Sequence, residues 1–331
     1  MYASPMATGN GAFVIHKILE NRIPGYRVIP YSPYRTLFPL SLLLSSYPQK
    51  TRLTHTTPDY AIFHHRKNIP LVLTFHNYVL DSFMRKYSSF LQNIHYQTDL
   101  RLLTKMAATR ADALTAVSQY TAQLARDDLR LKRPVKVIYN GVDHTLFRPC
   151  KQQKFRSDKK VRVLFCGNLT QRKGAQWLKP IAERVGPNIT IAYTAGLRTR
   201  NSLSVHPQLE CLGTIPHHAM PAVYQSADIL LFPTVREGFG LAAAEAMACG
   251  LPVVATDCSS LPELIDEGKG GFLCRIGDVT SFAQKIQLLA DNPLQRREMG
   301  EYNRNKIEKT FTLEQMVNQY IELFERLLTT G

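Results

Sequence analysis

A strand, a loop, a helix and a second strand can be read from one stretch of the sequence, residues 229–257. The apolar run at 229–232 ends in a proline, a Gly-Phe-Gly turn follows, and an alanine-rich helical pattern is ended by Gly-Leu-Pro before the apolar run at 253–255. This pattern predicts a β-α-β unit of an open parallel sheet. It places Glu237 in the loop beyond the first strand and Glu245 one or two turns into the helix, at the edge where such sheets bind ligands.

The rest of the chain repeats this alternation. A length of 331 residues exceeds the size at which one hydrophobic core stops growing. Short apolar runs, each expected to be a strand between helical patterns, lie at 60–63, 71–75, 113–117, 135–138 and 161–165. We predict an α/β chain with a first Rossmann-like domain at 1–145, a polar and basic linker at 146–160, a second Rossmann-like domain at 161–310 and a C-terminal helix at 311–331.

The start of the chain leaves little room for the first strand. Residues 1–8 already lead into the Gly-Asn-Gly turn at 9–11. Either the first strand is very short, or the given start lies downstream of a complete strand.

The positive charge is concentrated in the first half. Of the net charge of +15, residues 1–150 contribute 19 Lys and Arg against 8 Asp and Glu. A basic surface of this kind could bind an anionic membrane or a phosphate-bearing acceptor, or it could simply be exposed to solvent. No nucleic-acid-binding module is recognisable in the sequence.

The sequence lacks the patterns expected of a secreted or membrane-spanning protein. The six cysteines are widely spaced without a CxxC pair, which argues against a disulfide framework or a zinc site. No signal-peptide pattern is visible, and the longest apolar stretch, at 37–44, is far shorter than the ~20 residues of a membrane span. We expect a cytoplasmic protein, soluble or peripheral at the inner face of the membrane.

The residues around the two carboxylates form a recognisable signature. Glu237, seven residues and Glu245 are embedded in EGFGL and EAMACGLPVVAT, which resemble the retaining glycosyltransferases of family 4; NGVDHTLFRP at 140–149 resembles that family's interdomain segment. The resemblance covers most of the chain, strongly from residue 113 onward. It implies the GT-B architecture, in which two Rossmann-like domains face each other across a cleft and the second binds a nucleotide-sugar. In that architecture the last helix crosses back onto the first domain.

The resemblance also implies roles for the two carboxylates. Glu237 would contact the transferred sugar, and Glu245 would accept hydrogen bonds from the ribose, for which a carboxylate is a strong, charge-assisted partner. Glu245 could instead lie on a solvated helix face, although the alanines around it suggest close packing. The donor-binding candidates, for a UDP- or GDP-linked sugar as co-substrate without a resident cofactor, are Gly167, Asn168, Arg172, Lys173, Glu237, Gly238, Phe239, Gly240, Leu241 and Glu245.

A second loop suits a diphosphate. A leaving diphosphate is stabilised by cations and by backbone donors at a helix N-terminus. Residues 165–174, FCGNLTQRKG, follow a predicted strand and resemble the family's GRLxxxKG phosphate loop. Lys173 matches the family's Lys, whereas Asn168 replaces the usual Arg. Arg172 could supply the second charge, or be solvated like most basic loop residues.

The first half contributes a weaker set of candidates. His76 ends the predicted strand at 71–75, and although a lone His is usually structural, TFHNY resembles a family segment whose His contacts the transferred sugar. The glycines at 9–11 precede a helical pattern, where amides could approach phosphate or acceptor. VSQYT resembles the family's VSxxT near the donor, but its Ser is equally a helix N-cap. These candidates are Gly9, Asn10, Gly11, His76, Ser118 and Thr121.

The resemblance fixes the expected chemistry. It implies a front-face substitution without a protein nucleophile, so the catalytic candidates are His76, Lys173 and Glu237. The acidic pair Asp127-Asp128 lies in a basic helical run, and no metal site is predicted. We predict retaining transfer of a hexose to a glycan or lipid-linked glycolipid. A nucleotide-sugar epimerase on this architecture and a non-catalytic binding protein remain alternatives.

The acceptor is the least constrained feature. Residues 81–110 mix aromatic and basic side chains in a mostly helical pattern, close in sequence to the apolar stretch at 37–44. They could hold a lipid-linked acceptor at a membrane surface, or form an amphipathic helix that covers the core.

Overall fold

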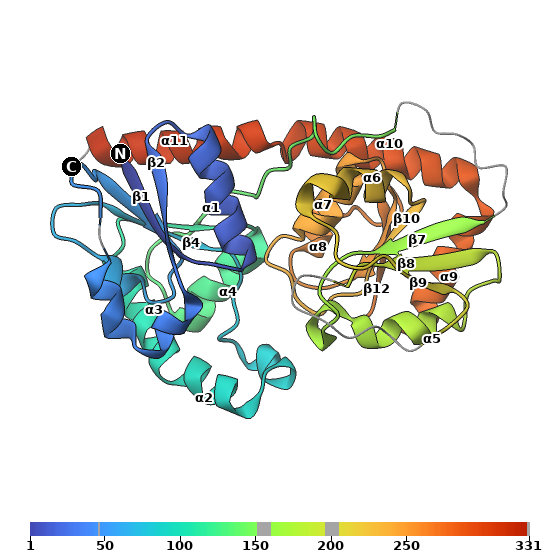
Figure 1. Ribbon diagram of the computed structural model, residues 1–331, viewed down its shortest axis with the longest axis horizontal. Helices are drawn as coiled ribbons and strands as arrows, with labels where there is room; N and C mark the ends of the chain where they lie inside the picture. The colour runs from blue at the N-terminus through green and yellow to red at the C-terminus, as the bar shows by residue number, and fades with distance from the viewer. Residues whose placement is uncertain (46, 151–159, 196–204, 330–331) are drawn as a thin grey trace. The chain divides into compact units, whose positions relative to one another are not determined.

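The computed structural model describes residues 1–45, 47–150, 160–195 and 205–329. The chain divides into two compact units, Met1–Asn140 with Glu314–Gly331 as unit 1 and Gly141–Leu313 as unit 2 (Figure 1). Unit 2 includes the stretch expected to be a linker, 146–160, of which residues 151–159 lie outside the described part.

Unit 1 is a parallel sheet with helices on both faces. The strand order is β2-β1-β3-β4-β5-β6, so the order reverses between β1 and β3. Its elements, with 3-10 helices written η, are β1 (Tyr2–Ala7), α1 (Gly11–Arg22), β2 (Tyr26–Tyr31), η1 (Pro33–Leu37), η2 (Pro39–Leu44), β3 (Leu53–Thr56), η3 (Ala61–His64), β4 (Leu71–Phe75), η4 (Ser82–Tyr87), α2 (Phe90–Gln97), α3 (Asp99–Arg110), β5 (Ala113–Ala116), α4 (Gln119–Leu129), β6 (Lys136–Val137) and α11 (Leu313–Thr329).

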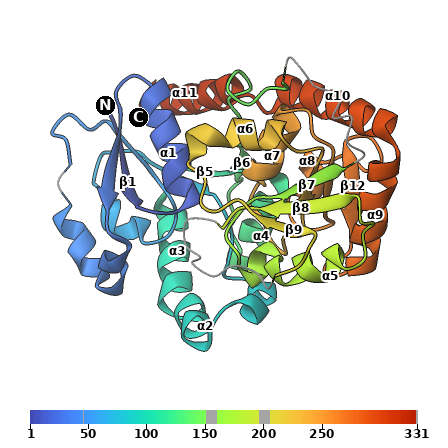
Figure 2. The ribbon, with the colours of Figure 1, turned by 45° about the vertical axis from the view of Figure 1, so that its right-hand side comes forward.

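The two faces of this sheet are covered by different helices. α1 and the C-terminal helix α11 lie on one face, and α3 and α4 lie on the other (Figures 1 and 2). On the α11 side, Phe324 stacks on Tyr26, and Tyr320 lies against His55. On the opposite side, small residues of α3 and α4 such as Ala107 and Ala125 are fully buried.

Two details of unit 1 differ from a simple reading of the sequence. The first strand, β1, has six residues, lies between β2 and β3, and pairs along its whole length with the edge strand β2. The strand expected at 60–63 is wrong, because Tyr60 has a left-handed backbone (φ 58°) that ends extended geometry and residues 61–64 form η3. The sheet position between β1 and β4 is filled by β3, whose LTHT sequence is polar but completely buried.

Unit 2 is also a parallel sheet between helices. α5 and α9 cover one face, and α6, α7 and α10 lie on the other (Figures 1 and 2). Its elements are β7 (Val161–Phe165), η5 (Gln171–Lys173), η6 (Ala175–Trp177), α5 (Leu178–Ala182), β8 (Ile189–Tyr193), β9 (Leu209–Cys211), η7 (His217–Ala219), α6 (Met220–Gln225), β10 (Ile229–Phe232), α7 (Leu241–Ala248), β11 (Val253–Thr256), α8 (Leu261–Leu264), β12 (Gly271–Cys274), α9 (Val279–Asp291) and α10 (Pro293–Thr310).

The strand order of unit 2 defines where a ligand would bind. The order β12-β11-β10-β7-β8-β9 is the doubly wound arrangement, with the direction of winding changing between β7 and β10. Ligands of such sheets bind beyond the carboxyl ends of the strands at this switch point. The loops after β7 and β10 carry Lys173 and Glu237.

Residues 142–147 are fixed to the rest of unit 2. Val142 pairs with Thr312, and the Arg304 guanidinium donates to the carbonyls of His144 and Phe147. Among the described residues, no helix is long and apolar enough to cross a membrane.

Candidate functional site

Lys173 and Glu237 meet at the switch point of unit 2. Lys173 lies at the end of η5 after β7, and Glu237 lies in the loop after β10. The Lys173 Nζ is 2.5 Å from Glu237 Oε1, and the two side chains are only 20% and 13% exposed. The structure therefore brings two of the sequence-predicted site residues into a direct ion pair.

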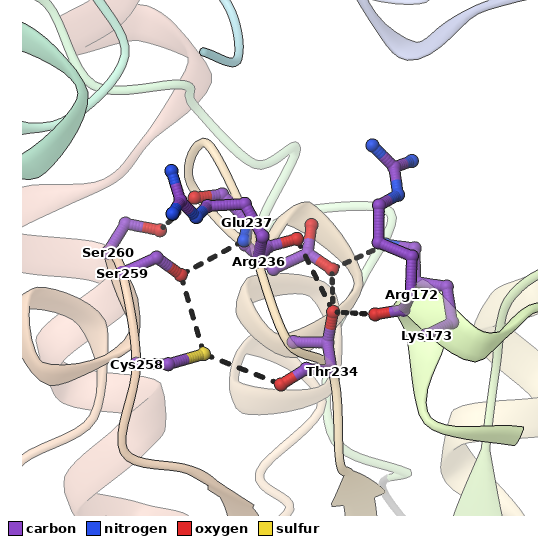
Figure 3. Close-up of polar contacts among 8 residues, drawn as sticks. All are labelled: Arg172, Lys173, Thr234, Arg236, Glu237, Cys258, Ser259 and Ser260. Carbon is purple, nitrogen blue, oxygen red and sulfur yellow. Dashed lines mark hydrogen bonds and ion pairs between the residues drawn. The ribbon is translucent and has the colours of Figure 1, made fainter. Parts of the chain in front are cut away.

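Thr234 ties the two loops together beneath this pair. Its hydroxyl lies 2.9 Å from Glu237 Oε1 and 3.0 Å from the carbonyl oxygen of Arg172 (Figure 3). The backbone N–H of Val235 donates to the same carbonyl at 2.9 Å. These contacts fix the spacing of the loops after β7 and β10, and with it the position of both charges.

The loop after β11 supports Glu237 from the other side. The Glu237 N–H donates to Ser259 Oγ at 2.9 Å, and the Ser260 hydroxyl donates to the Glu237 carbonyl at 3.3 Å (Figure 3). Burial raises the pKa of the neighbouring Cys258 thiol to about 12, so the thiol stays protonated and donates to the Thr234 carbonyl. Ser259 has a left-handed φ of 50°, a strained backbone of the kind found at functional sites.

The other phosphate-loop candidates precede Lys173 in the loop after β7. The backbone N–H of Gly167 donates to the Thr194 hydroxyl at 3.1 Å, and the Asn168 carbonyl accepts from Thr170 N. Arg172 is held through its carbonyl, while its guanidinium extends away from the contacts drawn in Figure 3. The chain turns sharply at Gly174, where φ is +78° and a Cβ atom would lie 2.0 Å from the Pro233 carbonyl oxygen.

Glu245 is buried, which corrects the alternative of a solvated helix face. Its side chain is 9% exposed; Oε2 accepts from the Tyr224 hydroxyl at 3.0 Å, and Oε1 lies 3.1 Å from His217 Nε2. The hydrogen bond to Glu245 raises the pKa of His217, whereas burial is the main cause that raises the pKa of Tyr224. Cys166 extends the group, with its Sγ 3.3 Å from the Tyr224 hydroxyl and its pKa raised to about 12 by burial.

The turn between Glu237 and Glu245 sets the direction in which α7 begins. Gly240 has a left-handed φ of +95°, and Phe239 is buried against Phe311 with ring centroids 5.5 Å apart. Gly238 and Leu241 flank these residues in the same turn. This turn leads from Glu237 into α7, whose first amides at Ala243 and Ala244 donate to the Gly240 carbonyl.

The remaining candidates lie in unit 1, at the end of a strand or the start of a helix. His76 directly follows β4, and its Nε2 lies 3.0 Å from Nε2 of the fully buried His16 in α1. Burial lowers the pKa of His76 to about 3, so this imidazole is neutral. Asn10 caps α1 by accepting from Phe13 N at 2.8 Å, between Gly9, with φ +78°, and Gly11.

Ser118 and Thr121 have structural contacts. Ser118 Oγ accepts from Thr121 N at 3.1 Å as the N-cap of α4, and the two side chains are hydrogen-bonded at 2.9 Å. The N-cap that the sequence allowed is therefore present, and the expected role near a donor stays a prediction.

Several residues of these groups carry no clear sequence signal. Thr234 and Ser259 could have been considered, because each follows a strand of the switch region. Tyr224, His217 and His16 come from helices far away in sequence, and no spacing connects them with the residues that they contact.

Comparisons with known proteins agree with this geometry. Residues 12–146 match the family model described as Glycosyltransferase Family 4, and residues 160–292 match that of Glycosyl transferases group 1. The chain belongs to the group 1, family 4 glycosyltransferases. Within this family, the N-acetyl-alpha-D-glucosaminyl L-malate synthase of Bacillus anthracis is 27% identical over 69% of this chain and 63% of its own length. The D-inositol 3-phosphate glycosyltransferase of Paenarthrobacter aurescens is 32% identical over 59% of this chain and 50% of its own length. The matches thus span only half to two thirds of these relatives.

Solved structures show that the fold is GT-B. The sucrose-phosphate synthase of Thermosynechococcus elongatus gives a TM-score of 0.85 at 19% identity, covering 100% of this chain and 99% of that one. Anabaena HepE, solved in complex with UDP and glucose, gives 0.77 at 17% identity, covering 98% and 99%. At such low identity these structures establish the shared α/β two-domain architecture alone.

Proposed function

We propose that the chain is a retaining glycosyltransferase that moves a hexose from a UDP- or GDP-linked sugar to a glycan or lipid-linked acceptor. The main support for the proposal is the Lys173–Glu237 ion pair at the switch point between β7 and β10 in the sheet of unit 2. Transfer must stabilise the charge that grows on the leaving diphosphate, and Lys173 supplies a cation beside backbone donors. The family assignment favours this activity over the epimerase and the non-catalytic binding protein.

Each carboxylate has a defined task in this proposal. Thr234 and Lys173 contact Glu237 at Oε1, which leaves Oε2 to accept from hydroxyls of the hexose. Glu245 accepts from the ribose, displacing the half-exposed His217 and keeping the buried Tyr224. No resident cofactor is needed, because the nucleotide-sugar is a co-substrate.

The proposed reaction is a front-face substitution. The bond from the anomeric carbon to the diphosphate breaks, and the bond to the acceptor oxygen forms on the same face. The proton of the acceptor hydroxyl passes to the leaving phosphate oxygen. Lys173 and the loop amides stabilise the diphosphate, while Glu237 and His76 orient the hexose. Arg172 is a second candidate phosphate ligand.

We propose that basic side chains, and not a metal ion, carry this charge stabilisation. The acidic pair of α4 is engaged elsewhere, since Asp128 binds Arg101 at 2.8 Å and also accepts from Tyr78. Activity should then persist in a chelator, and its loss on chelation with recovery on adding Mg²⁺ would contradict this part.

The experiment measures nucleoside-diphosphate release from UDP-, GDP- and ADP-sugars, with a membrane and glycan extract as acceptor. We expect release from one donor that rises with extract and falls about 100-fold or more in Glu237→Gln. Glu301→Gln, at an exposed ion pair of α10, is the matched control. Donor binding without release would favour the binding protein, and sugar isomerisation without release would favour the epimerase. The anomeric configuration of the product tests retention.

We also propose that unit 1 contacts the anionic cytoplasmic face of a membrane, where a lipid-linked acceptor would lie. Large apolar side chains in η1, in η2, at the residue between them and in the first turn of α2 are at least 71% exposed: Tyr34, Leu37, Phe38, Leu40, Leu44, Phe90 and Leu91. The Tyr60 hydroxyl, at the start of η3, lies 3.1 Å from Nε2 of His95 in α2, and η3 packs against η2, which in turn contacts η1. These segments are therefore neighbours. The net charge of +11 over residues 1–150 complements anionic lipid.

Vesicle cosedimentation tests this contact. We expect binding to vesicles that contain anionic lipid, weak binding to neutral vesicles, and loss of binding in Leu37→Ser/Phe38→Ser. Leu294→Ser, at an exposed leucine of unit 2, is the control. Equal binding by the double variant would overturn the assignment of this surface.

A further inference from the structure

Three imidazoles adjoin in the interior of unit 1. His16 of α1 stacks on His55 of β3 with ring centroids 4.4 Å apart, and it meets His76 edge to edge, with 3.0 Å between the two Nε2 atoms. His16 and His55 are completely buried. Burial is the main cause that lowers the pKa of all three, so each ring is neutral with one N–H and one acceptor nitrogen.

These rings belong to a continuous hydrogen-bonded chain. From the surface end, His76 Nε2 lies 3.0 Å from His16 Nε2, and His16 Nδ1 lies 2.8 Å from the Tyr26 hydroxyl. The Tyr26 hydroxyl lies 2.7 Å from His55 Nδ1, and His55 Nε2 lies 2.7 Å from Thr74 Oγ1. Thr74 Oγ1 lies 2.6 Å from Thr115 Oγ1, which lies 3.3 Å from the Leu73 carbonyl oxygen. Two further hydroxyls join at the side: Ser4 at His16 Nδ1 (2.7 Å) and Tyr320 at Thr74 (3.2 Å).

The far end of the chain fixes the direction of its hydrogens. A backbone carbonyl can only accept, so the Thr115 hydroxyl donates to Leu73. Because that hydroxyl has a single hydrogen, the 2.6 Å contact between Thr74 and Thr115 requires Thr74 to donate. His55 Nε2 must therefore carry the hydrogen that it donates to Thr74.

The same counting continues to His76. With its hydrogen on Nε2, neutral His55 accepts at Nδ1, and Tyr26 is the donor. Tyr26 has no second hydrogen to donate, so in its 2.8 Å contact with His16 the hydrogen must be on His16 Nδ1. The Ser4 hydroxyl oxygen accepts from the same N–H. The Nε2 of His16 is left as an acceptor, and the hydrogen of the last contact belongs to His76.

We propose that this chain holds His76 in its Nε2–H tautomer and so presents the Nδ1 lone pair to accept a hydroxyl of the transferred sugar. His16, Tyr26, His55, Thr74 and Thr115 are then positioning residues that act through His76. Only the effect on transfer rests on the proposed function, because the tautomer is a property of the free protein.

Thr115 gives the sharpest test, since it lies four hydrogen bonds away from His16. Thr115→Val keeps the shape of the side chain but removes both the acceptor for Thr74 and the link to the Leu73 carbonyl. Thr74 is then free to donate to His55 Nε2, and the chain can run in the opposite direction. Tyr320→Phe is the matched control, because it removes a buried hydroxyl that bonds the same Thr74 without belonging to the ordered chain.

Long-range ¹H–¹⁵N NMR of imidazole-labelled protein reads the tautomers directly, with His76→Gln assigning the His76 signals. We expect Nε2–H at His76 in the natural chain and in Tyr320→Phe, and a mixture or reversal in Thr115→Val. Transfer should then fall about two- to tenfold in Thr115→Val, as the competent fraction drops to between half and a tenth, and recover in Thr115→Ser.

The outcomes separate this inference from the proposed function. Nδ1–H at His76 in the natural chain would overturn the inference, even if Thr115→Val did not fold. An unchanged tautomer in folded Thr115→Val would also overturn it. If the tautomers behave as expected while no donor releases nucleotide, the proposed activity fails and the hydrogen-bond assignment stands.

Discussion

The Lys173–Glu237 pair should couple energetically in the protein without any ligand. Opposite charges about 4 Å apart attract by about 4 kcal/mol at an effective dielectric constant of about 20. This pair is closer, at 2.5 Å, but its side chains are 80% or more buried, and the cost of removing the charges from water offsets much of the attraction. We therefore expect a coupling free energy of about 1–3 kcal/mol from the double-mutant cycle of Lys173→Met and Glu237→Gln.

Urea unfolding followed by tryptophan fluorescence is the suitable assay. The chain has a single tryptophan, Trp177, which lies in η6 four residues after Lys173, so the signal reports the unfolding of unit 2. This matters because a chain of two units need not unfold in one step. Lys173→Met should be the more harmful single change, since it leaves the Glu237 carboxylate with Thr234 but without a cation.

The exposed pair of Arg297 and Glu301, at 68% and 61% exposure, provides the matched cycle. Its coupling free energy should be far smaller than that of the buried pair, because exposed ion pairs on helices contribute little to stability. If the Lys173–Glu237 coupling were no larger than that of the exposed pair, the two charges would not be held together in solution, and the preformed site would lose its main support.

Three further changes test other parts of the site. Glu245→Gln should weaken UDP binding about 10- to 100-fold in calorimetry, because a charged acceptor for the ribose is lost; equal affinity would remove Glu245 from the donor site. The hydrogen bond to Glu245 raises the pKa of His217. The His217–Glu245 ion pair therefore stabilises the folded protein fully below the ordinary pKa of histidine, and this stabilisation is lost as the pH rises through the raised pKa. The loss of thermal stability in His217→Asn should therefore be larger at about pH 6 than at about pH 8, and a loss independent of pH would show that no ion pair forms. Gly174→Ala should destabilise unit 2 by about 3 kcal/mol or more, against about 1 kcal/mol for Gly213→Ala, which shares a left-handed φ but has no atom within 4 Å of the added Cβ; similar losses at both positions would mean that the loops after β7 and β10 are not closely packed.

The segments that could be predicted from sequence are those whose signals are local. The unit formed by β10, α7 and β11 matches its expected bounds closely, because an apolar run, a glycine turn and an Ala-rich helix each mark their own ends. The fold class follows from the repetition of this pattern. The strand at 53–56 was missed for the opposite reason: LTHT has no apolar run, and its threonines and histidine are buried only because β1, β4 and a polar network surround them.

The same distinction explains which site residues were found. Glu237, Glu245 and Lys173 lie in two contiguous motifs, so one chain segment holds enough information to identify each. His16 and His55 lie 39 residues apart, on a helix and a strand, and each alone looks like an ordinary buried histidine. Their role depends on the direction of hydrogen bonds that pass through Tyr26, Thr74 and Thr115, and this direction is set by a single backbone carbonyl at Leu73. Because isosteric changes such as Thr115→Val preserve packing but not this direction, residues of this kind can be recognised only from the contacts in the folded chain.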